Sequence, residues 1–246
     1  MCEHHPMRRS LKIALAVVVG LVVLVAAGTA IYVWLQDSDP PLTQADVDER
    51  LDATTVPSDS TAGGESSGGG SAEGVDGTWA IGEGTEVGYR VDEVINGVDI
   101  TANGRTTEVT GSITISGTSA SAGEFVVDMA SITSDESRRD GQFRGRIMAT
   151  DQFPTATFTL TAPIDFGQIP DADTTITATA TGDLTLRGTT RSVTFEVQAT
   201  FRNDRIGILG QIPVVFADYG IPNPSFATIT TEDNGLLEFI LVLDRG

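Results

Sequence analysis

The sequence predicts an all-β, antiparallel barrel of eight or slightly more strands, preceded by one transmembrane helix. From Trp79 onward, apolar and polar residues alternate with a period of two, which is the pattern of half-buried strands. Turn-forming dipeptides such as Asn96-Gly97 and Asn234-Gly235 separate the alternating runs. Near the N-terminus, Ile13 to Leu35 is an uncharged stretch of 23 residues.

The composition excludes several classes of function. The chain has 15 Lys and Arg against 34 Asp and Glu, a formal charge of −19, so nucleic acid is not an expected partner. Cys2, His4 and His5 are the only residues of their kinds. The folded part therefore lacks a disulfide framework, a cysteine nucleophile, a Ser-His-Asp triad and the usual zinc ligands. We expect no enzyme activity and no cofactor, although a carboxylate-only site for a hard cation stays open.

The uncharged stretch is long enough to cross a membrane. As a helix, residues 13–35 would span about 35 Å, compared with a hydrocarbon core of about 30 Å. Basic residues precede it and acidic residues follow it, so we expect residues 1–12 in the cytoplasm and the remainder outside. A cleaved signal peptide, with small residues at 26–30, is the alternative. We prefer an uncleaved signal anchor because the apolar run continues past those small residues.

Residues 36–76 are predicted to be a disordered linker. They contain ten acidic residues and a single basic one, Arg50, and the second half is rich in Ser and Gly. Such a segment buries too little apolar surface to order itself. A short amphipathic helix over Pro40 to Leu51 is a less favoured alternative.

Residues 77–246 form the predicted β domain. Several alternating runs reach 10 to 13 residues, which favours a closed barrel over a sandwich because closure removes exposed edges. The runs are Val87–Val91, Val109–Ile115, Phe125–Met129, Ala156–Leu160, Ile176–Leu186, Val193–Phe201, Ile206–Phe216 and Leu237–Leu243. Six inward positions are small, and they either leave room for a ligand or let strands pack closely: Ala156, Ala178, Ala180, Gly182, Ala199 and Gly210.

One segment, Ser137 to Phe158, interrupts the alternation with a helix-like pattern. In a helix, Arg139 and Phe143 would share a face, which could place a charge and a ring at one entrance. Two interpretations of the arginines remain open. They either hold an anionic head group or pair with Asp135, Glu136, Asp140 and Asp151 in a solvated cluster. The four arginines are Arg138, Arg139, Arg144 and Arg146.

Spaced motifs in residues 77–244 resemble the YceI-like family. Arg139-Asp140 followed by Phe143, Ile147-Met148 and Asp151-Gln152-Phe153-Pro154 is similar to the family's R-D and F-F-D-x-x-x-Y/F-P-x-x-x-F elements. Residues 182–193 resemble its G-x-L-T-I-x-G-x-T-x-x-V segment, and residues 219–221 its F-G-I element. Ile147 and Met148 stand where the family has aromatic residues, and Phe153 where it often has tyrosine.

The resemblance implies a lipocalin-like barrel that binds a lipid, polyisoprenoid or similar amphiphile in an apolar pore, without catalytic residues. The candidate ligand-binding residues are Arg139, Asp140, Phe143, Ile147, Met148, Phe153 and Phe158. Together with the signal anchor, this predicts a membrane-tethered, extracytoplasmic binding protein of a bacterial cell envelope, with a homodimer left open. The alternative is a structural or interaction module whose barrel is filled. An enzyme using Asp140 and Asp151 ranks third.

Overall fold

The computed structural model describes residues 39–53, 74–168 and 172–246, and Asp39–Gly246 forms a compact unit by itself. Its helical elements are α2 (Gln44–Asp52), η1 (Met129–Ser131), α3 (Ser137–Gln142), η2 (Phe143–Ile147) and η3 (Phe216–Tyr219). Its strands are β1 (Gly77–Ile81), β2 (Glu86–Ile95), β3 (Val98–Thr106), β4 (Val109–Ser116), β5 (Ser119–Asp128), β6 (Thr155–Leu160), β7 (Ile164–Asp165), β8 (Thr175–Leu186), β9 (Thr189–Arg202), β10 (Arg205–Val215), β11 (Ile229–Thr231) and β12 (Asn234–Arg245).

The predicted membrane helix over residues 13–35 and the predicted cytoplasmic residues 1–12 lie outside the described residues. Within the described ranges, no helix has the length and apolar character needed to cross a bilayer.

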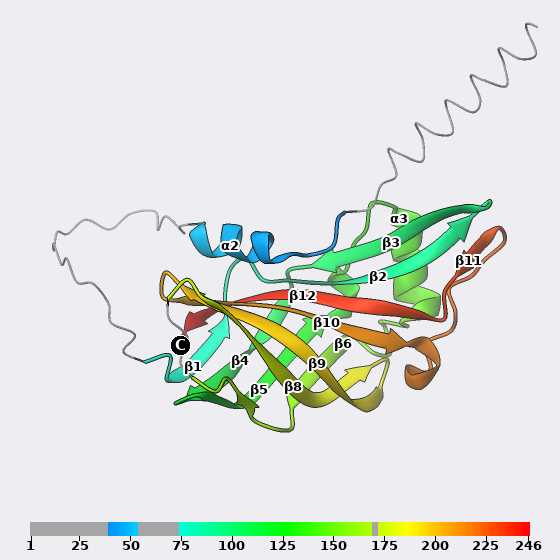
Figure 1. Ribbon diagram of the computed structural model, residues 1–246. Coiled ribbons are helices and arrows are strands. Elements are labelled where there is room, and N and C mark those ends of the chain that lie inside the picture. The colour runs from blue at the N-terminus through cyan, green and yellow to red at the C-terminus, as the bar shows by residue number, and fades with distance from the viewer. Residues whose placement is uncertain (1–38, 54–73, 169–171) are drawn as a thin grey trace, which may run out of the picture. The chain divides into compact units, whose positions relative to one another are not determined.

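Eight strands close into an antiparallel barrel, which confirms the predicted fold class. The ring runs β1-β4-β5-β6-β8-β9-β10-β12, and pairing of β12 with β1 closes it (Figure 1). Within the ring, β12 also pairs with β2, so β1 and β2 act as one long interrupted strand. Closure leaves no free edge along the ring, as expected for long strands that would otherwise expose backbone groups.

A long bent hairpin extends the barrel at one end. Gly77 pairs with Ile115 at its base, Val87 with Thr106 further along, and Ile95 with Val98 at its turn. The outer part, β2 and β3, continues beyond the ring, and the short strand β11 pairs with the end of β2. The barrel therefore has one end built up by β2, β3 and β11 (Figure 1).

The small inward residues divide into two groups. A Cβ on Gly182 would lie 2.4 Å from the Phe158 ring, and one on Gly210 would lie 2.3 Å from the Phe239 ring. Both glycines are therefore covered by an aromatic side chain on the neighbouring strand, a packing known to support glycine in sheets. The four alanines face open space, as described below.

Residues 39–53, which we call the strap, belong to the folded unit rather than to a disordered linker. In the strap, Val47 and Leu51 are 0% and 1% exposed and form a second hydrophobic cluster with Ile240 and Val242 of β12. Helix α2 lies on the outside of the barrel beside this strand (Figure 1). The outer face of β12 is apolar at Ile240 and Val242, so burying these side chains against the strap supplies the hydrophobic free energy that the acidic segment lacks by itself. This corrects the predicted linker, whose boundary at residue 36 included the strap.

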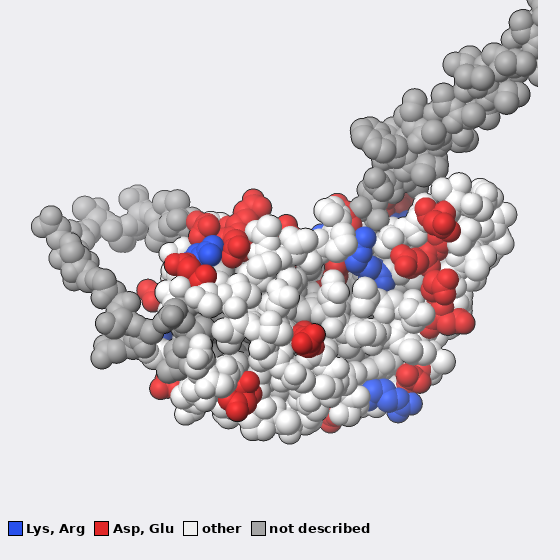
Figure 2. Space-filling model, viewed as in Figure 1, with Lys and Arg blue, Asp and Glu red and all other residues white. Residues whose placement is uncertain are grey.

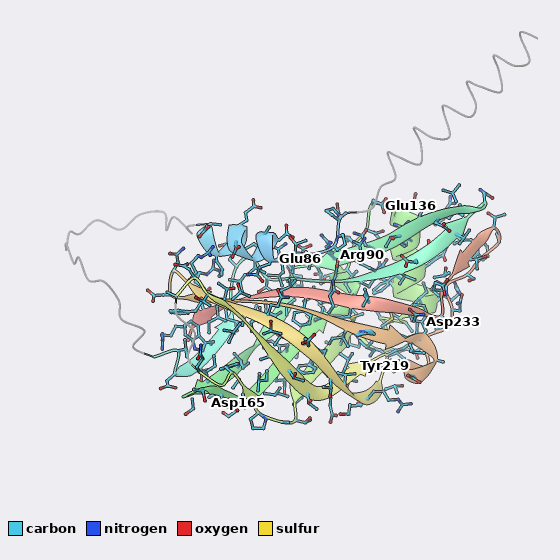
Figure 3. The ribbon with its side chains drawn as sticks, viewed as in Figure 1. Glu86, Arg90, Glu136, Asp165, Tyr219 and Asp233 are labelled. Carbon is cyan, nitrogen blue, oxygen red and sulfur yellow. The ribbon has the colours of Figure 1, made fainter. Side chains whose placement is uncertain are left out.

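A charged cluster beneath the strap completes its attachment. Glu238 of β12 is 0% exposed and accepts hydrogen bonds from Arg105 at 2.8 Å and from the Leu42 backbone N–H at 3.3 Å. Arg50 of α2 pairs with Glu86 at 2.5 Å. Glu86 and Arg90 lie on the side of the sheet that the strap covers (Figure 3). A buried carboxylate is tolerated here because it is paired and hydrogen-bonded.

The predicted helical insertion is present as α3 followed by the π-helical turn η2. The Glu136 side chain caps α3 by accepting from the Arg138 N–H at 3.0 Å. In η2, the Met148 N–H donates to the Phe143 carbonyl five residues back at 2.8 Å. The chain leaves the turn through Ala149 in the left-handed region, with φ 49°, and enters β6 after Pro154. Single π turns of this kind are frequent at functional sites.

Candidate ligand-binding bore

The inside of the barrel holds two adjoining cavities, an inner lobe and an outer lobe. The space open to the centre of a water molecule is about 120 Å³ in the inner lobe and about 130 Å³ in the outer lobe. Val87, Val127, Ala156 and Leu237 line both lobes, so the two cavities share a wall. The bore is therefore hollow, contrary to the alternative of a filled barrel.

The inner lobe is almost entirely apolar. Thr157 is the one polar residue on its wall among the described residues. The alanines at 156, 178, 180 and 199 line it, which shows that the small inward residues other than glycine leave room. Phe195 contacts Phe158 and Phe239 edge to face, with ring centroids 5.5 and 6.0 Å apart, and these rings shape the wall.

The outer lobe lies where the insertion meets β2 and carries the polar groups of the bore. Tyr89 and Phe143 stack with centroids 5.1 Å apart, and Arg139 and Glu93 are also on the wall. Burial raises the pKa of the Tyr89 hydroxyl, an effect that the nearby Arg139 charge partly opposes, so the phenol stays neutral at physiological pH. Arg139 forms an ion pair with Asp135.

The structure distributes the candidate site residues unevenly. Arg139, Phe143, Ile147 and Met148 line the outer lobe, and Phe158 lines the inner lobe. Asp140 and Phe153 line neither. Asp140 is buried and accepts from the Ser134 hydroxyl at 2.7 Å and the Ser134 N–H at 2.9 Å, so its carboxylate holds the loop before α3.

The predicted ion-pair cluster of four arginines is not formed among the described residues. Arg139 alone of the four pairs with a carboxylate. Arg146 instead donates to the carbonyls of Asn223 and Pro224, at 3.1 and 2.8 Å. It therefore ties the insertion to the loop after η3 across the mouth of the outer lobe.

Three of the spaced motifs meet in one contact at the mouth. The Phe153 ring covers Gly188, where a Cβ would lie 2.6 Å from the ring. Arg187 stands 5.8 Å from the centre of the same ring and donates to the Gly220 carbonyl at 2.6 Å. Arg187 and Gly188 both have positive φ, 48° and 73°, as the two-residue turn between β8 and β9 requires. The motif at 151–154 thus supports the mouth rather than lining the bore.

Sequence reasoning did not identify several residues of the outer lobe. Tyr89, Glu93, Val214 and Pro224 all line it. Tyr89 and Val214 belong to runs in which apolar and polar residues alternate, so the sequence predicts that they point inward. It does not predict which end of the barrel they occupy, because that depends on how the strands pair. Across the described ranges, no group of three or more His, Cys, Asp or Glu side chains is arranged to hold a metal ion.

Comparison with known proteins identifies relatives of this fold. The YceI-like domain matches residues 79–243. A polyisoprenoid-binding domain from Saccharophagus degradans superposes with a TM-score of 0.55 at 15% identity, covering 69% of this chain and 98% of that one. BcnA from Burkholderia cenocepacia gives a TM-score of 0.50 at 18% identity, covering 64% of this chain and 95% of that one. No curated protein matches the chain.

Proposed function

Because the chain belongs to the YceI-like family, we propose that it holds a long, mostly apolar amphiphile, such as a polyisoprenoid or other lipid, in its bore. The observation that carries the proposal is the apolar wall of the hollow inner lobe. Water or a polar ligand would find almost no hydrogen-bond partners there, whereas an apolar chain would be buried favourably. The structurally similar polyisoprenoid-binding domain from Saccharophagus degradans supports this ligand class. The role is binding, without a catalytic step.

The bore suits an extended chain. On β8, wall residues run from Ala178 in the inner lobe to Leu186 in the outer lobe. Eight residues rise about 26 Å along a strand, and a strand tilt of about 40° leaves about 20 Å along the barrel axis. Burying fifteen carbon atoms of such a chain would contribute about 12 kcal/mol at about 0.8 kcal/mol each. The association cost is about 4 to 15 kcal/mol, so this contribution offsets most of that range.

The polar end of the ligand would lie in the outer lobe. Arg139 is the one cation on its described wall, and its partner Asp135 lies toward solvent with a side chain 43% exposed. An anionic head group would compete with that exposed carboxylate for the guanidinium, which forms strong paired hydrogen bonds with phosphate and carboxylate oxygens.

We also propose that the barrel works outside the cytoplasm, tethered to the membrane by the helix predicted over residues 13–35. The charge asymmetry of the sequence around that stretch supports this orientation. A ligand class with long apolar chains is consistent with a location at a membrane.

A bore-filling variant tests the ligand site. Residues 39–246, which form a compact unit with its own core, are titrated with a dansyl-labelled fatty acid after circular dichroism has confirmed that they are folded. Co-purified lipids are read by native mass spectrometry. Ala178→Phe places a ring in the inner lobe, whereas Thr179→Phe adds the same ring to the exposed outer face of the same strand. We expect the probe affinity to fall at least tenfold in Ala178→Phe and to stay unchanged in Thr179→Phe. The proposal fails if the unmodified unit binds neither probe nor lipid, or if both variants bind equally well. The same spectra report whether two copies associate.

A further inference from the structure

Two neighbouring turns form a projecting apolar tip at the built-up end of the barrel. We define the apolar tip as Ile95, Val98, Phe226 and Ile229. Ile229 of β11 pairs with Ile95 of β2, and the Asn96 N–H donates to the Thr228 carbonyl at 3.3 Å. Phe226 and Ile229 exchange backbone hydrogen bonds of 3.0 and 2.9 Å. The two turns are therefore held side by side.

The strand register places the four side chains of the apolar tip on one face. Directly opposed residues of an antiparallel pair point to the same side of a sheet. Ile95 is opposed by Val98 and by Ile229, and Ile229 is bridged to Phe226. Along β2, this face is also the one that carries Val91, a residue of the outer-lobe wall. The face that lines the outer lobe thus continues outward onto the tip. Glu93 lies on it between Val91 and Ile95 and accepts a hydrogen bond from the Thr231 hydroxyl at 3.2 Å.

The tip is exposed to an unusual degree for apolar side chains. Among the described residues, three large hydrophobic side chains are exposed, and two of them, Phe226 at 64% and Val98 at 41%, belong to the tip. The third, Val215 at 48%, lies at the end of β10. Apolar side chains gathered at one rim indicate a contact surface rather than scattered surface residues.

The start of the folded unit indicates what covers this surface. The backbone carbonyl of Asp39 accepts from Arg90 at 2.6 Å and from Asn103 at 3.3 Å, on the outer face of the hairpin that carries the tip. Arg90 is five residues from Ile95, about 17 Å along the strand. Leu35, the end of the uncharged stretch, is four residues before Asp39, at most about 14 Å of chain.

We propose that the apolar tip inserts into the interface of a lipid bilayer and brings the outer lobe to the membrane surface. An apolar chain could then pass between the bilayer and the bore along the inner face of β2, past the Glu93 side chain. The inference rests on the proposed membrane tether, which would keep the tip close to lipid at a high effective concentration. The strap matters here because it is bound to the barrel. The free connection after Leu35 then ends at Asp39, instead of running through all 41 residues of the predicted linker at 36–76.

The charges around the tip select the kind of lipid surface. Asp92, Asp99, Glu232 and Asp233 flank the two turns and are exposed. Figure 2 shows acidic residues gathered over the end of the molecule where β11 and α3 lie. Like charges repel across less than a Debye length of about 10 Å at 0.1 M salt. The tip therefore favours neutral, zwitterionic lipid over anionic lipid.

The experiment places a fluorescent reporter at the tip. In residues 39–246, Phe226→Trp is compared with the matched control Val215→Trp, against phosphatidylcholine vesicles carrying brominated acyl chains. Trp79 is fully buried, and its signal is subtracted using the unmodified unit. We expect a blue shift and quenching of the Phe226→Trp fluorescence. A single myristoyl chain is half bound to membranes at about 0.1 mM lipid, so the smaller apolar tip should be half bound at lipid concentrations on the order of 1 mM. Val215→Trp should show neither, and anionic lipid should weaken binding in a way that salt reverses.

Several outcomes would overturn the inference. They are absent quenching at position 226, equal quenching at 215, stronger binding to anionic vesicles, or a blue shift that depends on protein concentration without lipid. The last would mean that the tip pairs with a second copy. Binding of the dansyl fatty acid without vesicles reports on the bore separately. Normal probe binding with no vesicle quenching therefore rejects the tip alone, and vesicle quenching with no probe binding rejects the proposed ligand site alone.

Discussion

Substitution of Leu51 by alanine tests whether the strap is part of the stable fold. Leu51 is 1% exposed and packs with Val47 against Ile240 and Val242 of β12. Gly207 of β10 lies beneath it, because a Cβ there would come within 3.0 Å of the Leu51 side chain. The strap thus fills a shallow site on the outer wall of the barrel.

The expected loss follows from this burial. Leucine-to-alanine changes at fully buried sites cost about 2 to 5 kcal/mol, depending on how far the surroundings collapse. The strap lies on the outside of the barrel and can settle inward, so we expect about 2 to 3 kcal/mol. For a unit of this size, each kcal/mol lowers Tm by about 2 to 4 °C, which gives a fall of about 4 to 12 °C.

Urea and thermal unfolding of residues 39–246, followed by circular dichroism, measure the loss. Glu49→Ala is the matched control, because Glu49 is exposed on the same helix and its removal should change stability by less than about 0.5 kcal/mol. Equal stability of Leu51→Ala and Glu49→Ala would refute the reasoning and return the strap to the status of a linker.

Four further outcomes are expected. Glu238→Gln should lower the free energy of unfolding by about 2 to 3 kcal/mol in urea titrations, because it removes the fully buried carboxylate that pairs with the partly buried Arg105 and Arg90. Gly188→Val should destabilise the protein by about 1 to 3 kcal/mol on the same assay, because a side chain there meets an aromatic ring and needs positive φ. Arg139→Gln should lower the affinity for an anionic dansyl fatty acid about tenfold in fluorescence titrations. The affinity for a neutral dansyl-labelled fatty amide of the same chain length should stay unchanged. The hydrogen bond from Thr43 lowers the pKa of Asp46 below its ordinary 3.8. The stabilisation from this carboxylate is therefore present above pH 3.8 and is lost as the pH falls through the lowered pKa. In Asp46→Asn, the free energy of unfolding measured in urea should fall less steeply with decreasing pH in this range.

The alternation of the sequence was sufficient to predict the barrel because strand pairing has an exact side-chain period. Each run with apolar residues at every second position became a strand or lies largely within one. The predicted interruption over Ser137 to Phe158 became α3 and η2, which end at Ile147, and β6 begins at Thr155 within it. The expectation that Arg139 and Phe143 share a face follows from helical spacing alone, and both reach the outer lobe.

The strap was beyond a local reading of the sequence. Val47 and Leu51 are spaced by four, as an amphipathic helix requires, but two apolar residues among acids cannot order a segment by themselves. Their partners, Ile240 and Val242, are almost 200 positions away. Besides the spacing of Val47 and Leu51, which underlay the less favoured helix over Pro40 to Leu51 and is found as α2, the other local signal was the unbroken apolar run from Phe239 to Leu243, which is typical of a strand buried on both faces.

The sequence by itself determined the helical insertion, the family and the strands β2, β4, β5, β6, β8, β9, β10 and β12, because periodicity and spaced motifs are local properties of the chain. It did not identify β1, β3, β7 and β11. The tertiary structure alone decided which small residues leave space and which are covered. The Phe158 and Phe239 rings lie directly over Gly182 and Gly210, whereas Ala178 and Ala180 line the inner lobe, although Phe195 is opposite Ala180 on the neighbouring strand. It also decided that Phe153 packs on the turn at Gly188 while Phe143 lines the outer lobe. Both distinctions depend on which residues closure of the barrel brings together, and contacts between distant segments are not encoded in any one stretch of sequence.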